Sequence, residues 1–291
     1  MSESYIAYRT KQRVMRLGNF MLKAPMINDD TTRIVPWSYQ GFTYTGDVIE
    51  DVRVQVHYIN AMRSNTSSKY EKKSASGEIG DSGITMLSFH YNGVEGMHLQ
   101  SYYYYAPELY STFIAQSEYE FLDVNDVHHC IGVQYFNSSD GGKYSDTYSR
   151  NGGDDIDLLA LRIAVDTENW LVSLNYSKNF GVSGIVKGYG GLAKVYTSSM
   201  IANGRGNYKP ETWMLKTKYE FPIASYNSEI AFNFTNTKVH EKREDDFNAY
   251  YVHFKHYFNE DTSIYLRYEN MNYLSDKSDA SYFRAIATYR F

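Results

Sequence analysis

The sequence has few of the features that mark other protein classes. Its 291 residues include one cysteine and five prolines, and no apolar run approaches the roughly 20 residues that a transmembrane helix needs. The lone Cys130 excludes an intramolecular disulfide. The first residues show neither the basic nor the apolar region of a signal peptide, so for an exported protein we expect a removed signal or a missing N-terminal part.

What the sequence does contain is aromatic and alternating. There are 30 tyrosines, aromatic residues reach 16%, the net charge is −5, and the mean hydropathy is −0.52. Polar and apolar residues alternate through most of the chain instead of separating into polar loops and apolar elements. A barrel in lipid needs this mixture, with apolar side chains outside, polar ones inside and aromatic girdles at both interfaces.

The alternation has a period of two, as in a β-strand. In 229–237, Ile230, Phe232 and Phe234 fall on one face, and Glu229 and Asn233 fall on the other. Each such run is close to the 9–11 residues that a tilted strand needs to cross a bilayer. The pattern predicts an all-β, transmembrane antiparallel β-barrel of about 14 strands in one domain, 1–291, with strands in or near 5–17, 36–45, 52–58, 84–91, 97–105, 110–121, 127–137, 156–166, 170–179, 213–221, 229–237, 247–258, 262–273 and 281–291.

The connections between these strands alternate in length. Short turns fall at 92–95, 122–126, 167–169, 222–226 and 259–261, and most longer links fall between them, at 64–82, 138–154, 180–210 and 239–246. Short periplasmic turns opposite longer external loops are typical of outer-membrane barrels. If the last strand descends to the periplasm, the alternation places 18–35 outside, after an ascending strand at 5–17.

The C-terminus supports the same fold. Phe291 ends the chain, and Tyr289 and Phe283 share its face, whereas Arg284, Thr288 and Arg290 lie on the other. A terminal aromatic residue after alternating apolar positions resembles the signal that the barrel-assembly machinery reads. We therefore expect this machinery as a partner, together with outer-membrane lipid.

A distinctive stretch at 17–41 resembles the OprD-type family of substrate-selective outer-membrane porins. The family pattern is a glycine step, a proline, an acidic pair, an arginine, an apolar pair, a proline, an aromatic residue and a glycine. The matching positions are Gly18, Pro25, Asp29, Asp30, Arg33, Ile34, Val35, Pro36, Trp37 and Gly41. A weaker likeness covers the glycine-rich 188–206 and the terminal Phe291.

The resemblance implies an integral protein of the bacterial outer membrane, a monomer or weak homotrimer, through which small solutes diffuse. Family barrels have roughly 18 strands and about 400 residues, so about four N-terminal strands would be missing here, although 14 strands could also close by themselves. In the family the third external loop folds inward and narrows the pore. We expect 18–35 to do so, with 180–209 as a second inward-folded constriction loop.

The face opposite the apolar one should line the lumen, because the side-chain period is two. Rings or ladders of basic residues select anions in pores. The predicted lumen is net basic, which favours anionic or zwitterionic solutes such as carboxylates and amino acids; the alternative is that these residues only pair with nearby carboxylates. Its predicted basic residues are Arg9, Lys11, Arg13, Arg53, Arg63, Arg162, Lys216, Lys218, Lys255, Arg267 and Arg284.

Arg33, beside Asp29 and Asp30, is the predicted constriction residue. Its guanidinium could grip a substrate carboxylate as a fork, or it could form a salt bridge that holds the loop. Both roles remain open at the level of sequence.

Two other classes are weighed against a pore. A barrel hydrolase, either phospholipase or protease, needs paired catalytic side chains, but His128 and His129 oppose each other on one strand, as do His253 and His256. A plugged barrel serving as an adhesin is more usual with fewer strands. We expect no enzyme, no metal, no cofactor and, given the acidic balance, no nucleic-acid partner.

Overall fold

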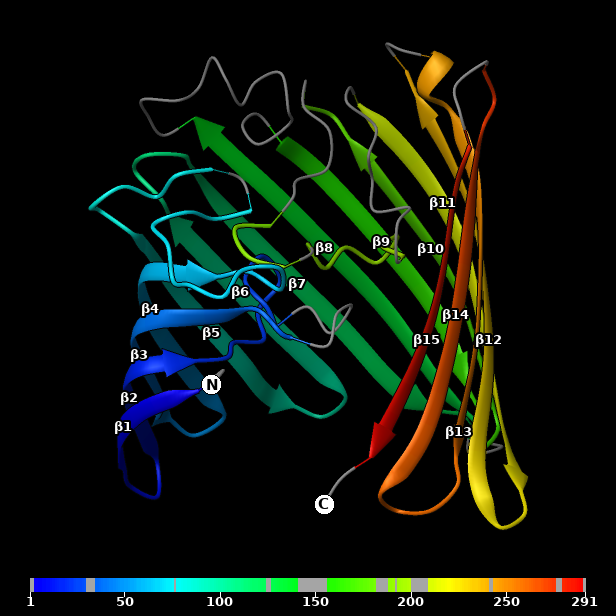
Figure 1. Cartoon of the computed structure of the whole chain (residues 1–291), viewed down its shortest axis with the longest axis horizontal. Coiled ribbons are helices and arrows are strands. Elements are labelled where there is room, and N and C mark those ends of the chain that lie inside the picture. The colour runs from blue at the N-terminus through cyan, green and yellow to red at the C-terminus, as the bar shows by residue number, and fades with distance from the viewer. Residues whose placement is uncertain are drawn as a thin grey trace. The chain divides into compact units, whose positions relative to one another are not determined.

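The fold is known from a computed structural model, which describes residues 3–29, 35–75, 77–123, 127–140, 156–181, 188–191, 193–199, 209–240, 243–275 and 279–289. One antiparallel sheet contains fifteen strands whose neighbours follow chain order (Figure 1), from β1 to β15. The strands are β1 (Ser4–Arg9), β2 (Arg13–Phe20), β3 (Ser38–Ile49), β4 (Val52–Arg63), β5 (Ile84–Val94), β6 (Met97–Tyr105), β7 (Tyr110–Leu122), β8 (His128–Asp140), β9 (Ile156–Asp166), β10 (Trp170–Asn179), β11 (Pro210–Ile223), β12 (Tyr226–Val239), β13 (Phe247–Tyr257), β14 (Thr262–Tyr273) and β15 (Ala280–Tyr289), with one 3-10 turn, η1 (Arg243–Asp245).

The predicted all-β antiparallel architecture is confirmed, but the strand count is fifteen instead of about fourteen. The extra strand comes from 5–17, predicted as one strand, which is a hairpin of β1 and β2. Thr10 makes the turn: its backbone N–H donates to the Arg13 carbonyl at 2.8 Å, and its hydroxyl accepts from the Arg13 N–H at 3.1 Å. The predicted strand at 36–45 is β3.

The alternation of the sequence becomes two chemically different faces. On β10 and β11, Trp170 and Trp213 are 51% and 48% exposed, and Val172, Leu174 and Leu215 lie on the same side. We call this side the apolar face, and the side carrying Ser173, Asn175 and their equivalents on other strands the polar face. No helix in the described ranges is long and apolar enough to cross a membrane.

The described residues form two compact units. Unit 1 comprises Met1–Tyr119, Val133–Leu159 and Asn179–Val195, and unit 2 comprises Glu120–Gly132, Ala160–Lys178 and Tyr196–Phe291. Unit 1 has its core on the polar face, where Phe20, Met26, Ile27, Tyr39 and Tyr104 are fully buried. A smaller core in unit 2 joins Phe247, Ala249 and Met271, packed against Tyr273 and Ala280.

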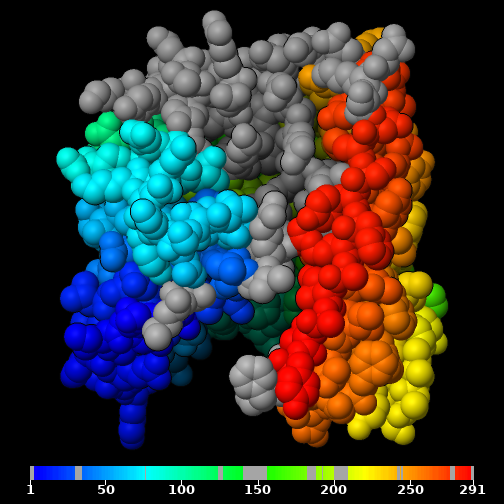
Figure 2. Space-filling view, in the orientation of Figure 1, coloured from blue at the N-terminus to red at the C-terminus, as the bar shows by residue number. Residues whose placement is uncertain are grey.

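The long link between β4 and β5 is an ordered part of unit 1. The N–H and carbonyl of Met62 both bond to Glu71, at 2.8 and 2.9 Å, and Lys73 bridges to Glu78. Within it, the Lys72 ammonium holds the pKa of the exposed Asp81 carboxyl below its usual value. In space-filling view its cyan atoms pack directly against the blue atoms of the first strands (Figure 2).

Candidate solute-binding face

Most of the predicted basic residues lie on the polar face. The strand registers place them in phase with polar-face neighbours: Lys216 is opposite Asn233, and His253 is opposite Arg267. The residues with this placement are Arg9, Arg53, Arg162, Lys216, Lys218, Lys255, Arg267 and Arg284.

The predicted ladder of Arg9, Lys11 and Arg13 is wrong, because these residues lie around the β1–β2 turn instead of along one strand. Lys11 is in the turn itself, and Arg13 pairs with Gly46 in the phase of the apolar Met15 and Leu17. The same turn brings Arg16, which the single-strand interpretation placed on the other side, onto the polar face opposite Thr43. Sequence reasoning missed Arg16, and only recognition of a Thr10 turn could have found it.

Arg63 is not in the phase predicted for it. The register of β3 and β4 shifts by one residue between Gln40 and Gly41, which leaves Asn60 unpaired. A bulge of this kind reverses the faces of all later residues in the strand. Arg63 is only 8% exposed, and its guanidinium lies 5.7 Å from the centre of the Tyr70 ring in the β4–β5 link.

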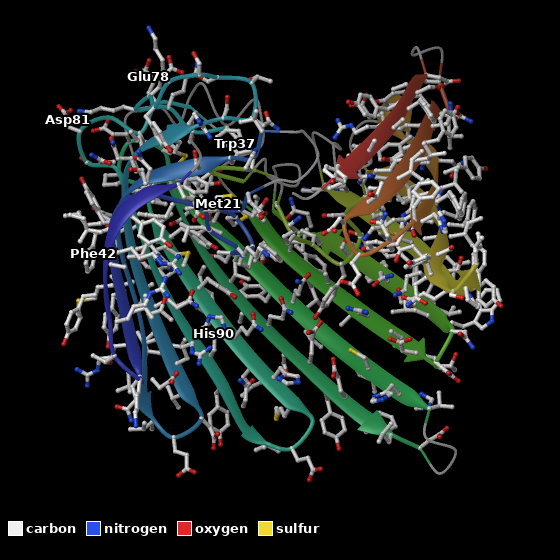
Figure 3. The ribbon with its side chains drawn as sticks, turned by 60° about the horizontal axis from the view of Figure 1, so that its bottom comes forward. Met21, Trp37, Phe42, Glu78, Asp81 and His90 are labelled. Carbon is white, nitrogen blue, oxygen red and sulfur yellow. The ribbon has the colours of Figure 1, made fainter. Side chains whose placement is uncertain are left out.

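Two segments outside the strands pack together on the polar face of unit 1. We call residues 21–29 and 188–191 the inner segments. The Asn28 N–H donates to the Gly190 carbonyl at 2.8 Å, the Gly190 N–H donates to the Met26 carbonyl at 3.2 Å, and Ile27 and Gly190 form a parallel bridge. Figure 3 shows Met21 and Trp37 on the opposite side of the sheet from Phe42.

Tyrosines fix the inner segments to the strands. The Tyr39 hydroxyl donates to the Asn28 carbonyl at 2.6 Å, and the Met26 N–H donates to the Tyr104 hydroxyl at 3.3 Å. The Tyr189 ring lies between those of Tyr104 and Tyr110, with centroids 5.5 and 4.9 Å away. Burial raises the pKa of the Tyr189 phenol well above its usual value, so it stays neutral and donates to the Tyr110 carbonyl at 2.7 Å.

Of the predicted constriction residues, the structure describes only Asp29. It is half-buried at the end of the first inner segment, and its carbonyl accepts from the Trp37 N–H at 2.8 Å. Asp30 and Arg33 lie outside the described residues, as do parts of 180–209. In the predicted assembly signal, Phe283 and Tyr289 are each 66% exposed on the apolar face, and Phe291 lies outside the described residues.

Unit 2 carries a cluster of arginines on aromatic rings. The Arg267 guanidinium lies 5.7 Å from the ring centre of Tyr251 and 5.2 Å from that of Tyr265, and its Nε donates to the Tyr251 hydroxyl at 3.1 Å. Arg284 pairs directly with Arg267 across β14 and β15, and lies 4.9 Å from the Tyr282 ring centre. Two neighbouring cations are thus oriented by tyrosines.

Some polar-face cations are neutralised and others are not. Arg53 pairs with Asp47 at 2.9 Å, Lys218 pairs with Glu220, and His253 lies 2.9 Å from Glu229. For Arg16, Arg267 and Arg284, no carboxylate lies within 4.0 Å in the described part of the chain. These three keep a positive charge that a solute could meet.

Comparison with known proteins decides the family. Residues 5–228 match the family model described as outer membrane porin, OprD family. The chain belongs to the OprD family. It is therefore an integral protein of the bacterial outer membrane and a channel for small solutes, and its lipid contacts lie on the apolar face, where cations would cost about 2–4 kcal/mol each at mid-depth.

Solved structures share the fold of this OprD-family porin. OccAB4 of Acinetobacter baumannii is 16% identical, with a TM-score of 0.82 over 98% of this chain and 73% of that one. OpdK of Pseudomonas aeruginosa, solved with vanillate, is 16% identical, with a TM-score of 0.81 over 98% of this chain and 77% of that one. No curated protein sequence matches.

Family relatives and structural neighbours of the porin are channels and not enzymes. Its histidines on the described strands serve structure: His256 bonds to Ser228 at 2.9 Å, and His253 lies between Tyr251 and Tyr265. Across the described ranges, no three histidine, cysteine or acidic side chains gather as a metal site would require.

Proposed function

We propose that this porin favours small anionic or zwitterionic solutes, carboxylates and amino acids among them, and conducts them along the polar face. The observation that carries the proposal is the Arg267–Arg284 pair, which has ring contacts in place of carboxylate partners. A cation held on an aromatic face keeps its full charge and its free N–H donors, so it can attract and bind a passing carboxylate.

The remaining basic residues of the polar face extend this field. Arg9, Arg53, Arg162, Lys216, Lys218 and Lys255 line other strands, and those with carboxylate partners contribute less. Lys255 lies 4.6 Å from the Tyr257 ring centre, the same arrangement as in the arginine pair. The relative OpdK, solved with the carboxylate vanillate, is consistent with this solute class.

The inner segments supply the constriction in this proposal. Residues 21–29 lead directly to Asp30 and Arg33, and their bonds to 188–191 hold both segments on the polar face. Arg33, Asp29 and Asp30 then grip a solute at the narrowest point. Recognition of Phe291, Tyr289 and Phe283 by the barrel-assembly machinery, and a monomeric or weakly trimeric state, belong to the same proposal.

Reversal potentials across a salt gradient test the selectivity. The double variant Arg267→Gln, Arg284→Gln should lower the anion-over-cation permeability ratio by about twofold or more, because two charges leave the wall of the solute path. Lys238→Gln is the matched control, since Lys238 is exposed, in unit 2, and in the phase of the apolar face. An unchanged ratio in the double variant, or an equal fall in the control, would contradict the proposal.

A further inference from the structure

A pocket of about 270 Å³ lies on the polar face of unit 1, beside the first inner segment. Four residues of that segment and three neighbouring strands, β2, β3 and β4, line it; Met21 marks it in Figure 3. The lining residues are Val14, Arg16, Met21, Leu22, Lys23, Ala24, Thr43, Thr45, Gln55 and His57.

Two buried polar atoms in this lining lack a partner. Arg16, Thr43 and His57 face one another in a row across β2, β3 and β4. In the described part of the chain, neither Nε of Arg16 nor Nδ1 of His57 has a hydrogen-bond partner, and His57 is only 4% exposed. Buried polar groups are nearly always hydrogen-bonded, so two such atoms lining one pocket point to a ligand.

The pocket is positively charged. Its lining includes Arg16 and Lys23 and no acidic residue. The nearest acids are engaged elsewhere: the Glu3 carboxylate accepts from the Met21 N–H at 3.2 Å, and Asp47 pairs with Arg53. The Tyr5 ring, 5.1 Å from the Arg16 guanidinium, orients the cation without neutralising it. An anionic group therefore suits Arg16.

The second atom asks for a different group. Nε2 of His57 lies 3.4 Å from Oε1 of Gln55, which also accepts from the Ser88 hydroxyl at 3.3 Å. Since Oε1 is only an acceptor, Nε2 carries the proton, and Nδ1 of the neutral ring is left as an acceptor. It needs a donor such as a hydroxyl group. Val14, Met21 and Leu22 give the pocket apolar walls for a carbon skeleton between the two ends.

We propose that this pocket binds a small hydroxylated carboxylate, with the carboxylate on Arg16 and the hydroxyl group on His57. The site stores or selects such a solute beside the inner segment. It rests on the proposed solute path only in that the ligand must reach the polar face, and it is distinct from the Arg267–Arg284 pair in unit 2.

Calorimetric titration of the full chain in detergent micelles tests the site without any conductance. The probes are 3-hydroxybutyrate and butyrate, which differ by one hydroxyl group. We expect 3-hydroxybutyrate to bind about tenfold more tightly than butyrate, and Arg16→Gln to weaken it by about tenfold or more. His57→Phe, which keeps an aromatic ring, should remove the preference for the hydroxylated probe. Arg9→Gln is the charge-matched control, on the same face and outside the pocket lining.

Each outcome decides one part. Equal binding of both probes, or a preference that survives His57→Phe, overturns the role of His57. Binding that survives Arg16→Gln, or falls equally in Arg9→Gln, overturns the site, as does the absence of binding by either probe. Anion-selective conductance with no calorimetric binding would refute the pocket alone, and binding without anion selectivity would refute only the proposed function.

Discussion

At the scale of single residues, the polar face keeps its arginines charged by setting them on aromatic rings. Arg16 lies over Tyr5, Arg267 over Tyr251 and Tyr265, and Arg284 over Tyr282. A carboxylate partner would orient the guanidinium equally well but would cancel its field. The abundance of tyrosine in the sequence therefore serves the polar face as well as the lipid interface, where the aromatic girdle accounts for it.

The Tyr39 hydroxyl gives a prediction at this scale. It is fully buried and donates to the Asn28 carbonyl at 2.6 Å. Tyr39→Phe should lower the free energy of unfolding by about 1–2 kcal/mol, because the buried carbonyl loses its hydrogen bond. Urea unfolding in detergent micelles measures this. Tyr44→Phe, on the apolar face of the same strand, should change it by less than about 0.5 kcal/mol; equal effects of the two changes would show that the bond to Asn28 contributes nothing.

At the scale of elements, the period-two pattern predicts strands well because burial in lipid acts on every second residue. The strand at 36–45, the alternation of Phe283 and Tyr289, and the turns at 167–169 and 259–261 all follow from it. The pattern fails where phase changes without a change in composition. Around Thr10, basic and polar residues occupy both phases, so the β1–β2 turn leaves no mark in the alternation.

The β4 bulge is hidden for a similar reason. Asn60 is one extra residue between Ile59 and Ala61, and nothing in its type announces that it is unpaired. As a result Arg63 is misplaced by sequence reasoning. The inner segments could be expected only from the family resemblance, and their mutual bonds, which join positions more than 150 residues apart, have no local signal.

Gly191 gives a prediction for the inner segments. Its φ is +79°, and a Cβ there would lie 2.3 Å from Oδ1 and 2.7 Å from the carbonyl oxygen of Asn28. Gly191→Ala should therefore cost about 1–3 kcal/mol of strain and separate the two segments. Limited proteolysis should cleave this region about tenfold faster or more. Gly96→Ala, at a positive φ of 71° in the β5–β6 turn, is the control; no difference between the two variants would show that the segments do not depend on this contact.

At the scale of the whole molecule, the account depends on one assignment: the apolar face meets lipid and the polar face meets the solute path. The family match over 5–228 and the likeness to solved porins agree with the alternating faces of all fifteen strands. The two faces differ by a single step along any strand, so adjacent residues can test the assignment.

Thiol modification during single-channel recording makes this test most directly, at Asn233 on the polar face and its neighbour Phe232 on the apolar face of β12. The starting variant is Cys130→Ser, which removes the native thiol. A water-soluble, negatively charged thiol reagent should reduce the conductance and the anion preference of Asn233→Cys stepwise, and leave Phe232→Cys unchanged. Modification of current in Phe232→Cys alone, or in neither variant of a conducting chain, would contradict the assignment of the polar face to the solute path.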